Sequence, residues 1–526
     1  MISRPVNLDV LLSIRPHLSR EDELNLSSTC STVRALLRPY IFSSYHWDDS
    51  SEPLRSLWPL IKHLYVHSDG LRMIDVSGFF RNLNHLCSIH VKGDQITPAL
   101  ASVLAAAPNL HTLDFSYLCY RNEDPNMSSL LWPTIGAFPS LSCKPRAISF
   151  CSRHGAAYLD VDDCWYCEEK IYISRDSFAS LLREIDISLV EGLEVGVEAM
   201  SLPFATAYTW ASLRVLIITG KSLHPADASP ELGVNPDIRA HANVHLGTIL
   251  QSAPHLRVLR ILCRCLDRVT YPHYVVWPSR EPLPPLGTVI PSLEDLDFRN
   301  PSLDEGLLGQ LPPSLKALSL MCYPHLTHGT TDSLWPLRTM EPVRGTRTAD
   351  ELTALLEITA LPELRQLRIS FRLLEDMSLF RCISARLPLL EVLEVHAEIG
   401  IGCLWTPEQL RQFALALESL KRLRELRINT FCNVLFVPGE EEDLSDMSDE
   451  EAVEELRSYG HHRWWRGIHA DLIAEALATL QGVSRFWLPS TVAISRRRDK
   501  RVWRTYWIDR EEDIPRLRMD PDSHIE

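Results

Sequence analysis

The chain has 526 residues, 45% of them hydrophobic, and a formal net charge of -15. That length exceeds what one compact core usually holds, and the acidic balance argues against a general nucleic-acid binder, which needs a basic stripe to neutralise phosphates. No apolar run approaches the ~18 residues that span a bilayer, and the N-terminus lacks a signal peptide's apolar centre. The 13 cysteines are typical of reduced thiols. We expect a soluble protein of the cytoplasm or nucleus, with neither a membrane nor a nucleic-acid partner.

Residues 5–47 have the pattern of two or three short helices. Two apolar stripes follow helical spacing: Leu8, Leu11 and Leu12, then Leu26, Cys30, Val33 and Leu37. Ser19 and Asp22 have the spacing of a capping box, and Pro39 is expected to end the last helix. The sequence therefore predicts a small, all-α N-terminal module over residues 1–50.

The order and spacing of this module resemble the F-box family. The matching stretches are 8–14, 18–24, 29–30, Arg34 and 38–42. Four positions depart from the family's pattern: Val6-Asn7 falls where its Leu-Pro pair stands, Thr29 on an aliphatic position, Val33 on the usual Trp, and Glu23 where a leucine is common. The module thus resembles a degenerate F-box.

The resemblance implies that the module docks on a Skp-type adaptor, which hangs from a cullin, by burying an apolar ridge in a groove of the partner. By matching positions, the residues implied to contact the adaptor are Leu8, Leu11, Ile14, Leu18 and Leu24. The alternative is that the module only caps the rest of the chain. In that case the stripe would be buried against a first strand near Leu64 and Val66.

The rest of the chain repeats one phrase: Leu, two variable residues, Leu, one variable residue, then an aliphatic or aromatic residue. It occurs at Leu110/Leu113/Phe115, Leu213/Leu216/Ile218, Leu256/Leu259/Ile261, Leu293/Leu296/Phe298, Leu315/Leu318/Leu320, Leu364/Leu367/Ile369, Leu390/Leu393/Val395 and Leu423/Leu426/Ile428. The last two positions alternate like a strand with one buried face, and the first belongs to the turn before it. A recurring phrase of this kind predicts a repeat architecture.

Several phrases follow a segment with helical spacing, as at 100–107, 246–253 and 410–417. Thr406-Pro407 has the pattern of a helix start, and Thr348/Glu351 has capping-box spacing. The expected unit is helix, short turn, strand, and such units must stack to bury their apolar faces. The pattern resembles the leucine-rich repeat family, in an irregular form, and an ordinary multi-domain α/β protein remains the alternative.

The combination resembles the expanded F-box/leucine-rich-repeat families of mushroom-forming fungi. We expect an α/β solenoid over residues 54–526, with parallel strands on one face and helices on the other. Inserted loops are expected at about 139–175, 221–241, 268–291, 323–349 and 437–462. The resemblance implies the substrate-recognition subunit of an SCF-type ubiquitin ligase, in which the repeats bind an unknown target protein. The alternative is a repeat scaffold that binds proteins and has no ligase role.

Side chains that point away from the helices would form the target-binding face. Period-two geometry assigns one such position to each repeat: Asp114, Asp186, Arg260, Asp297, Ser319, Arg368, Glu394 and Arg427. Of these, Arg260, Asp297, Arg368, Glu394 and Arg427 are our candidates for partner binding, because guanidinium groups and carboxylates match charged segments of other proteins.

Three further patterns stand outside the repeats. Cys164 and Cys167 form the one CxxC, but its spacing to other ligands is poor for zinc, so we expect no metal and no cofactor. Residues 440–455 hold ten acidic residues and predict a disordered loop in which Ser445 and Ser448 suit an acid-directed kinase. The basic cluster 496–501 lies between two strand-like runs and fits a hairpin turn or a nuclear import signal. The sequence contains no nucleotide-binding, zinc-protease or serine-hydrolase signature, so we expect no enzyme.

Overall fold

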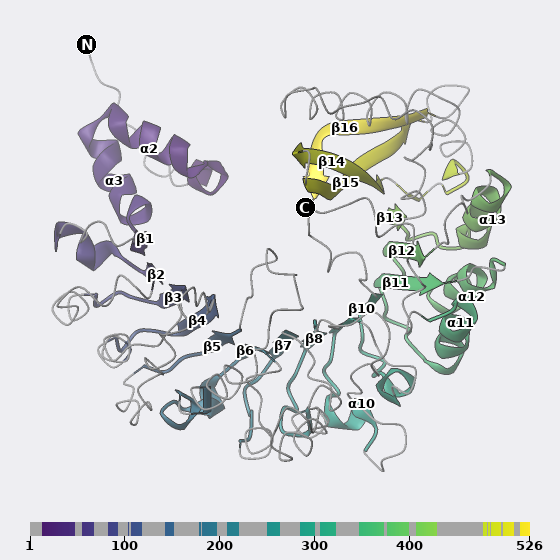
Figure 1. Ribbon diagram of the computed structural model, residues 1–526, viewed down its shortest axis with the longest axis horizontal. Helices are drawn as coiled ribbons and strands as arrows, with labels where there is room; N and C mark the ends of the chain where they lie inside the picture. Colours follow the sequence, from purple (N-terminus) through teal and green to yellow (C-terminus); the bar gives the residue numbers. More distant parts are fainter. Residues whose placement is uncertain are drawn as a thin grey trace, which may run out of the picture. The chain divides into compact units, whose positions relative to one another are not determined.

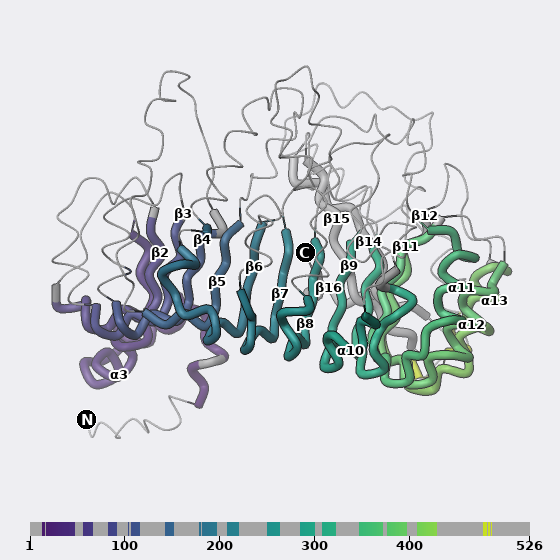
Figure 2. Tube along the Cα trace, turned by 90° about the horizontal axis from the view of Figure 1, so that it is seen from below, coloured from purple at the N-terminus to yellow at the C-terminus, as the bar shows by residue number. Residues whose placement is uncertain are grey.

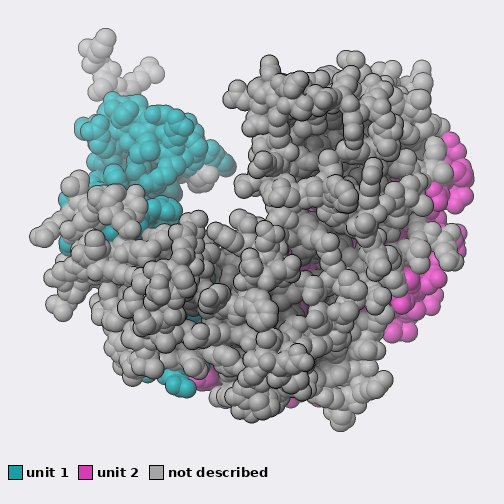
Figure 3. All heavy atoms as spheres, viewed as in Figure 1, with its two compact units in different colours: residues 1–155, 164–200 teal, residues 156–163, 201–526 magenta. Residues whose placement is uncertain are grey.

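The computed structural model describes the repeats and the N-terminal helices, with gaps between them. The described residues are 13–47, 55–67, 83–92, 104, 107–117, 143–151, 178–179, 181–196, 208–219, 250–262, 284–299, 306–321, 347–372, 376–398, 407–428, 477–480, 482–483, 485–495, 498–509 and 516–525. The chain forms two compact units, coloured separately in Figure 3. Unit 1 holds residues 1–155 and 164–200, and unit 2 holds residues 156–163 and 201–526.

Unit 1 begins with the expected helices, in the order η1 (Arg15–His17), α2 (Arg20–Thr29) and α3 (Ser31–Ile41) (Figure 1). The capping box of Ser19 and Asp22 is confirmed, since the Ser19 hydroxyl accepts from the Asp22 amide and the Asp22 carboxylate accepts from the Ser19 amide. Val33, Leu37 and Ile41 form the core of this module, with Leu26, Leu36 and Phe42 packed against them.

Two details of the expected module are wrong. Cys30 lies between α2 and α3 in extended conformation and caps α3, so the stripe from Leu26 to Leu37 belongs to two helices that pack together. Pro39 does not end α3, which continues to Ile41. Pro39 has no N–H and so cannot donate a helical hydrogen bond, but only two residues of α3 follow it, so the helix loses little by this.

The strands of unit 1 pair in parallel, each with its neighbours in chain order. They are β1 (Ser44–Trp47), β2 (His63–His67), β3 (Ser88–Lys92), β4 (Thr112–Tyr117), β5 (Ala147–Phe150) and β6 (Gly192–Gly196). Two short 3-10 helices lie between them, η2 (Arg55–Leu60) before β2 and η6 (Ile187–Leu189) before β6.

Unit 2 continues the same pattern. Its parallel strands are β7 (Val215–Thr219), β8 (Val258–Ile261), β9 (Asp295–Arg299), β10 (Ala317–Met321), β11 (Gln366–Arg372), β12 (Val392–Glu398), β13 (Glu425–Ile428) and β14 (Arg485–Ser495). Two antiparallel strands follow, β15 (Arg498–Asp509) and β16 (Arg516–Ile525). The hairpin expected around 496–501 is confirmed, although residues 498–501 belong to β15 rather than to the turn.

Full helices precede the later strands of unit 2. They are α11 (Ala349–Ile358), α12 (Ser378–Arg386) and α13 (Pro407–Leu417), which lie side by side on one face of the sheet (Figures 1 and 2). The capping box of Thr348 and Glu351 is confirmed at α11. Among the described residues, only α10 (Leu286–Val289) and the 3-10 helix η9 (Gly306–Gln310) precede β9 and β10. The 22-residue spacing from Leu293 to Leu315 leaves no room for a longer helix.

The core of both units is a ladder of apolar pairs. The second and fourth residues of strands β2 to β13, such as Leu64 and Val66 in β2 or Leu367 and Ile369 in β11, are at most 3% exposed. Burying each such side chain stabilises the fold by about 1.5–3 kcal/mol. The eight leucine phrases all lead into strands, namely β4 and β7 to β13, so the expected α/β leucine-rich-repeat-like fold is confirmed within each unit.

A backbone pattern fixes where these strands begin. The carbonyl oxygen of the residue just before one strand accepts two consecutive amides at the start of the next strand. For example, Lys62, which precedes β2, accepts through its carbonyl oxygen from Cys87 and Ser88 at the start of β3, at 2.7 and 3.0 Å. Unit 2 repeats this arrangement, as where Lys316 O accepts from Arg365 and Gln366 at 2.8 and 3.0 Å. These shared acceptors set the register of each strand against its neighbour through the backbone alone.

Two of the expected inserted loops are placed differently. The range 139–175 contains β5 at residues 147–150, and the range 268–291 contains α10 at residues 286–289. The β5 segment lacks the leucines that mark the other repeats, since Pro145 and Ile148 stand at their positions in the phrase that leads to Phe150. The expected loops at 221–241 and 437–462 lie outside the described residues.

Candidate functional site

The third residue of each strand lies between the two buried residues and therefore projects from the opposite face of the sheet. In β7 this residue is Ile217, the register partner of Arg260. From β8 to β13 these residues are polar register partners from strand to strand, and we call them the unit 2 row: Arg260, Asp297, Ser319, Arg368, Glu394 and Arg427. All five partner-binding candidates are members of this row. What they bind stays a prediction.

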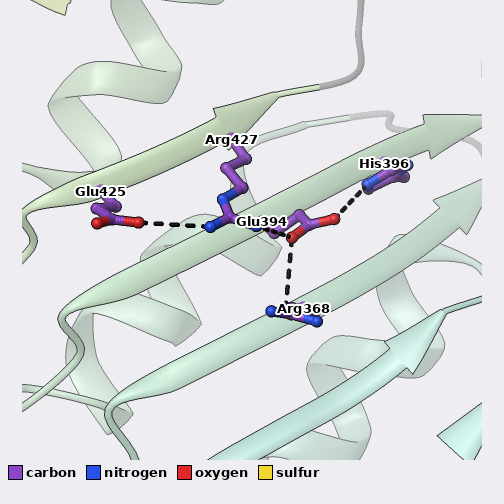
Figure 4. Close-up of polar contacts among 5 residues, drawn as sticks. All are labelled: Arg368, Glu394, His396, Glu425 and Arg427. Atoms are coloured by element: carbon purple, nitrogen blue, oxygen red, sulfur yellow. Dashed lines mark hydrogen bonds and ion pairs between the residues drawn. The ribbon is translucent and has the colours of Figure 1, made fainter. Parts of the chain in front are cut away.

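Glu394 is the centre of a charged cluster in this row (Figure 4). Its carboxylate lies 3.5 Å from Arg368 Nε on β11, 3.3 Å from Arg427 Nη1 on β13, and 2.9 Å from His396 Nε2 on its own strand. Arg427 also reaches Glu425 Oε2 at 3.5 Å. The Glu394 side chain is only 8% exposed, so it orients its two arginines rather than facing solvent.

The environment of Glu394 favours its charged form. Burial alone would raise the pKa of this carboxyl, but the hydrogen bond from His396 and the charges of His396 and the two arginines outweigh burial and hold the pKa below its ordinary value. Glu394 is therefore ionised at neutral pH. The surface of this cluster consists of the half-exposed Arg368 and the more buried Arg427.

Asp297 has the opposite balance. Burial raises the pKa of its carboxyl, and the Ser319 hydroxyl and the surrounding arginines offset only part of that effect. Its Oδ1 atom is buried without a hydrogen-bond partner in the part of the chain that the structure describes. A buried carboxylate with an unmatched oxygen costs stability, so Asp297 is held in place by the strand rather than by its own contacts.

Arg260 pairs with Asp295, not with its register partner Asp297. The distance from Arg260 Nη2 to Asp295 Oδ2 is 2.9 Å, and the Arg260 side chain is about half exposed. Such exposed pairs contribute about 0–1 kcal/mol each. Arg260 therefore lies at the accessible end of the row, where a partner's acidic group can compete for it at little cost.

Unit 1 has its own row at the same strand position, which we call the unit 1 row: His46, Tyr65, His90, Asp114, Ser149 and Glu194. The rings of His46 and Tyr65 stack with centroids 4.3 Å apart and planes 7° apart, and those of Tyr65 and His90 stack at 4.4 Å and 9°. His90 Nδ1 lies 2.8 Å from Asp114 Oδ2, and Ser149 Oγ donates to Glu194 Oε2 at 2.9 Å.

A second line of polar groups supports this stack. His63 Nδ1 lies 2.8 Å from Ser88 Oγ, which in turn lies 3.4 Å from His90 Nε2. Burial, together with the nearby positive groups His90, Lys62 and His111, lowers the pKa of His63. His63 is therefore neutral at pH 7, and the hydroxyl of Ser88 links it to His90.

Of the unit 1 row, only Asp114 was predicted from the sequence, and the other residue predicted for this face, Asp186, is wrong. Asp186 is not in a strand: it caps the 3-10 helix η6, where its side chain accepts from the Ser188 amide. The strand residue at that repeat is Glu194 in β6. The signal was the alternation around Tyr65 and His90, which lie between aliphatic residues just as Arg368 does; it was overlooked because isoleucine replaces leucine in these phrases.

The N-terminal module exposes part of the apolar stripe expected to contact an adaptor. Ile14 is 42% exposed and Leu24 is 46% exposed, whereas Leu18 is half-buried. The core of the module closes without them. Leu8 and Leu11 lie outside the described residues, as do Ser445, Ser448, Cys164 and Cys167.

Two other properties concern only the described part of the chain. There, no helix has both the length and the apolarity to cross a membrane. Within the same residues, no three His, Cys, Asp or Glu side chains are grouped so that they could hold a metal ion. Burial raises the pKa of the Cys143 thiol to about 11, which makes it an unreactive core residue.

No protein-family model matches the sequence, and no curated protein matches it. Among solved structures, the chain is similar to the leucine-rich repeat-containing protein LegL7 from Legionella pneumophila, with 13% sequence identity and a TM-score of 0.27, over 85% of this chain and 90% of that one. So low a score bears on neither function nor the arrangement of the units. The fold assignment rests instead on the order, direction and register of the strands.

Proposed function

We propose that this chain is the substrate-recognition subunit of an SCF-type ubiquitin ligase. In this function the N-terminal module docks on a Skp-type adaptor and, through it, a cullin, while the sheet faces bind the target protein. The chain itself catalyses nothing; it brings a target to the ligase. Such a protein acts in the cytoplasm or nucleus, where the ligase assembles.

The observation that carries the proposal is the exposure of Ile14 and Leu24. Among the residues whose side-chain burial is described, only five large apolar side chains are strongly exposed, and these two belong to the short N-terminal module. The module has a closed core of its own, so neither residue is needed to complete it. If the module only capped the repeats, this stripe would be buried against the first strands; an exposed stripe instead fits a partner that covers it.

The rows supply the second half of the proposal. Both present polar side chains at a fixed spacing of about 4.8 Å, one for each strand, on a regular backbone, and the unit 1 row adds rings. Repeat proteins use such faces for extended protein partners. The unit 1 row offers stacked rings and carboxylates, and the unit 2 row offers arginines held by Glu394, so each suits a different part of a target.

The test is a titration of the full chain with a recombinant Skp-type adaptor. We expect binding by the wild type and a loss of at least about thirtyfold in the Ile14→Glu, Leu24→Glu variant, because two charges would be buried at the interface. Ile358→Glu is the matched control: Ile358 is 71% exposed at the end of α11, in unit 2, and its replacement should leave binding unchanged. A folded wild-type chain that does not bind would contradict the ligase function and leave a protein-binding repeat scaffold.

A further inference from the structure

One charged side chain links three elements of the N-terminal module. Arg15, in η1, places its Nε atom 2.9 Å from Glu23 Oε1 in α2, and its guanidinium carbon lies 4.1 Å from the ring centroid of Tyr40 in α3. The Glu23 side chain is 10% exposed, and that of Arg15 is 32% exposed. The contact is therefore a largely buried ion pair with an aromatic ring against the cation.

The pair directly adjoins the exposed apolar residues. Arg15 follows Ile14 and Glu23 precedes Leu24, so both anchors are chain neighbours of the surface they support. The η1 turn has three residues, and the Arg15 carbonyl accepts the Leu18 amide at 3.0 Å. So short a turn has little stability of its own. Its position against α2 and α3 depends on side-chain contacts.

We propose that the Arg15–Glu23 pair, seated on Tyr40, is a positioning device that holds η1 against α2 and α3 so that Ile14, Leu18 and Leu24 form one docking surface. This inference rests on the proposed adaptor-binding function. It also explains the departure at Glu23, where a leucine is common in the F-box pattern: the carboxylate replaces an apolar contact by a charge that Arg15 neutralises.

The chemistry of the pair makes the device sensitive to the loss of either partner. Arg15 Nε has no aligned hydrogen-bond acceptor among the described residues, so its attraction to Glu23 is mainly between charges, strengthened by burial. Removing one partner leaves the other buried and unpaired, whereas replacing both by apolar side chains removes the need for pairing. The double substitution should therefore reverse the effect of the single one.

The experiment compares four full-length proteins: wild type, Glu23→Gln, the Arg15→Met, Glu23→Leu double variant, and Glu21→Gln. Glu21 is the matched control, because it is an exposed acid in the same helical turn. Two quantities are measured for each protein, namely affinity for the Skp-type adaptor and hydrogen exchange of the Leu18 amide. We expect Glu23→Gln to weaken binding about tenfold and to speed exchange, the double variant to restore both, and the control to change neither.

The outcomes separate this inference from the proposed function. A wild-type chain that does not bind the adaptor would contradict the proposed function. Hydrogen exchange of the Leu18 amide would still decide whether the Arg15–Glu23 pair holds η1. Unchanged exchange in Glu23→Gln overturns the positioning role even if binding falls, since Glu23 would then act on the adaptor itself. A double variant no better than the single one also overturns it. Circular dichroism of each protein shows whether the helices remain folded.

Discussion

The two rows differ in chemistry although they occupy the same strand position on the same kind of backbone. The unit 1 row begins with three stacked rings, His46, Tyr65 and His90, whereas the unit 2 row alternates positive and negative side chains around Glu394. The buried second and fourth residues are alike in both units. The comparison teaches that the core specifies the fold, while the residue between the buried pair is free to specialise the surface.

The largest expected effect comes from breaking the charged row at its centre. Glu394→Gln removes the charge that Arg368 and Arg427 share, and should lower the free energy of unfolding by about 2–4 kcal/mol, because two partly buried guanidinium groups lose their counterion. Urea unfolding measures the loss. Glu391→Gln is the control: Glu391 forms a more exposed pair with Arg365, and its loss should cost below about 1 kcal/mol. Equal losses in the two variants would mean that Glu394 has no central role.

The next effect comes from breaking the ring stack. Tyr65→Ala removes both stacked contacts and should cost about 1–2 kcal/mol, since each aromatic pair contributes about 0.5–1.5 kcal/mol beyond burial. Tyr65→Phe keeps the ring and should stay within about 0.5 kcal/mol of wild type. Repeating both measurements in 1 M salt sharpens the contrast: the loss in Tyr65→Ala should not change, whereas that in Glu394→Gln should shrink. A strong salt dependence at Tyr65 would contradict a contribution that comes mainly from ring stacking.

The smallest effect concerns the pH dependence within the unit 2 row. The pKa of Asp297 is raised above 3.8, so the fold favours its protonated form and its charge costs stability as pH rises through the folded-state pKa. The pKa of Glu394 is lowered below 4.5, so its contribution is present above 4.5 and lost as pH falls through the folded-state pKa. Asp297→Asn should therefore stabilise the protein at pH 7 by up to about 1 kcal/mol, with no gain below pH 3.8. Thermal unfolding at both pH values tests this, and destabilisation at pH 7 would show that Asp297 is needed as a charge.

The sequence predicts most of the strands whose repeat phrase is built on leucine and few of those in which another aliphatic residue replaces it. The spacing of Leu367 and Ile369 predicts that both are buried and that Arg368, between them, points to the opposite face, because alternation is a local property of a strand. Ile89 and Val91 carry the same information for His90, but a pattern built on leucine passes over them. Asp186 was misplaced because a side chain that caps a turn can look like one between strand residues.

Contacts between side chains on different strands could not be predicted from the sequence. Nothing near Glu394 in the chain reveals that Arg368 and Arg427, 26 and 33 residues away, share its carboxylate, since that depends on which residues become register partners. The same holds for Arg15 and Glu23, whose pairing depends on how η1 folds back on α2. The residue types were visible; their neighbours were set by the fold.

The shared carbonyl acceptors before the strands carry an implication for how such a chain changes over generations. Because Lys316 O sets the register of β11 through two backbone amides, that strand begins correctly whatever number of residues separates it from β10. Within unit 2 the distance between successive leucine phrases ranges from 22 to 49 residues without any change in strand pairing. Insertions between repeats can thus arise, lengthen and be lost while the sheet stays intact. The inserted loops can therefore evolve independently of the strands.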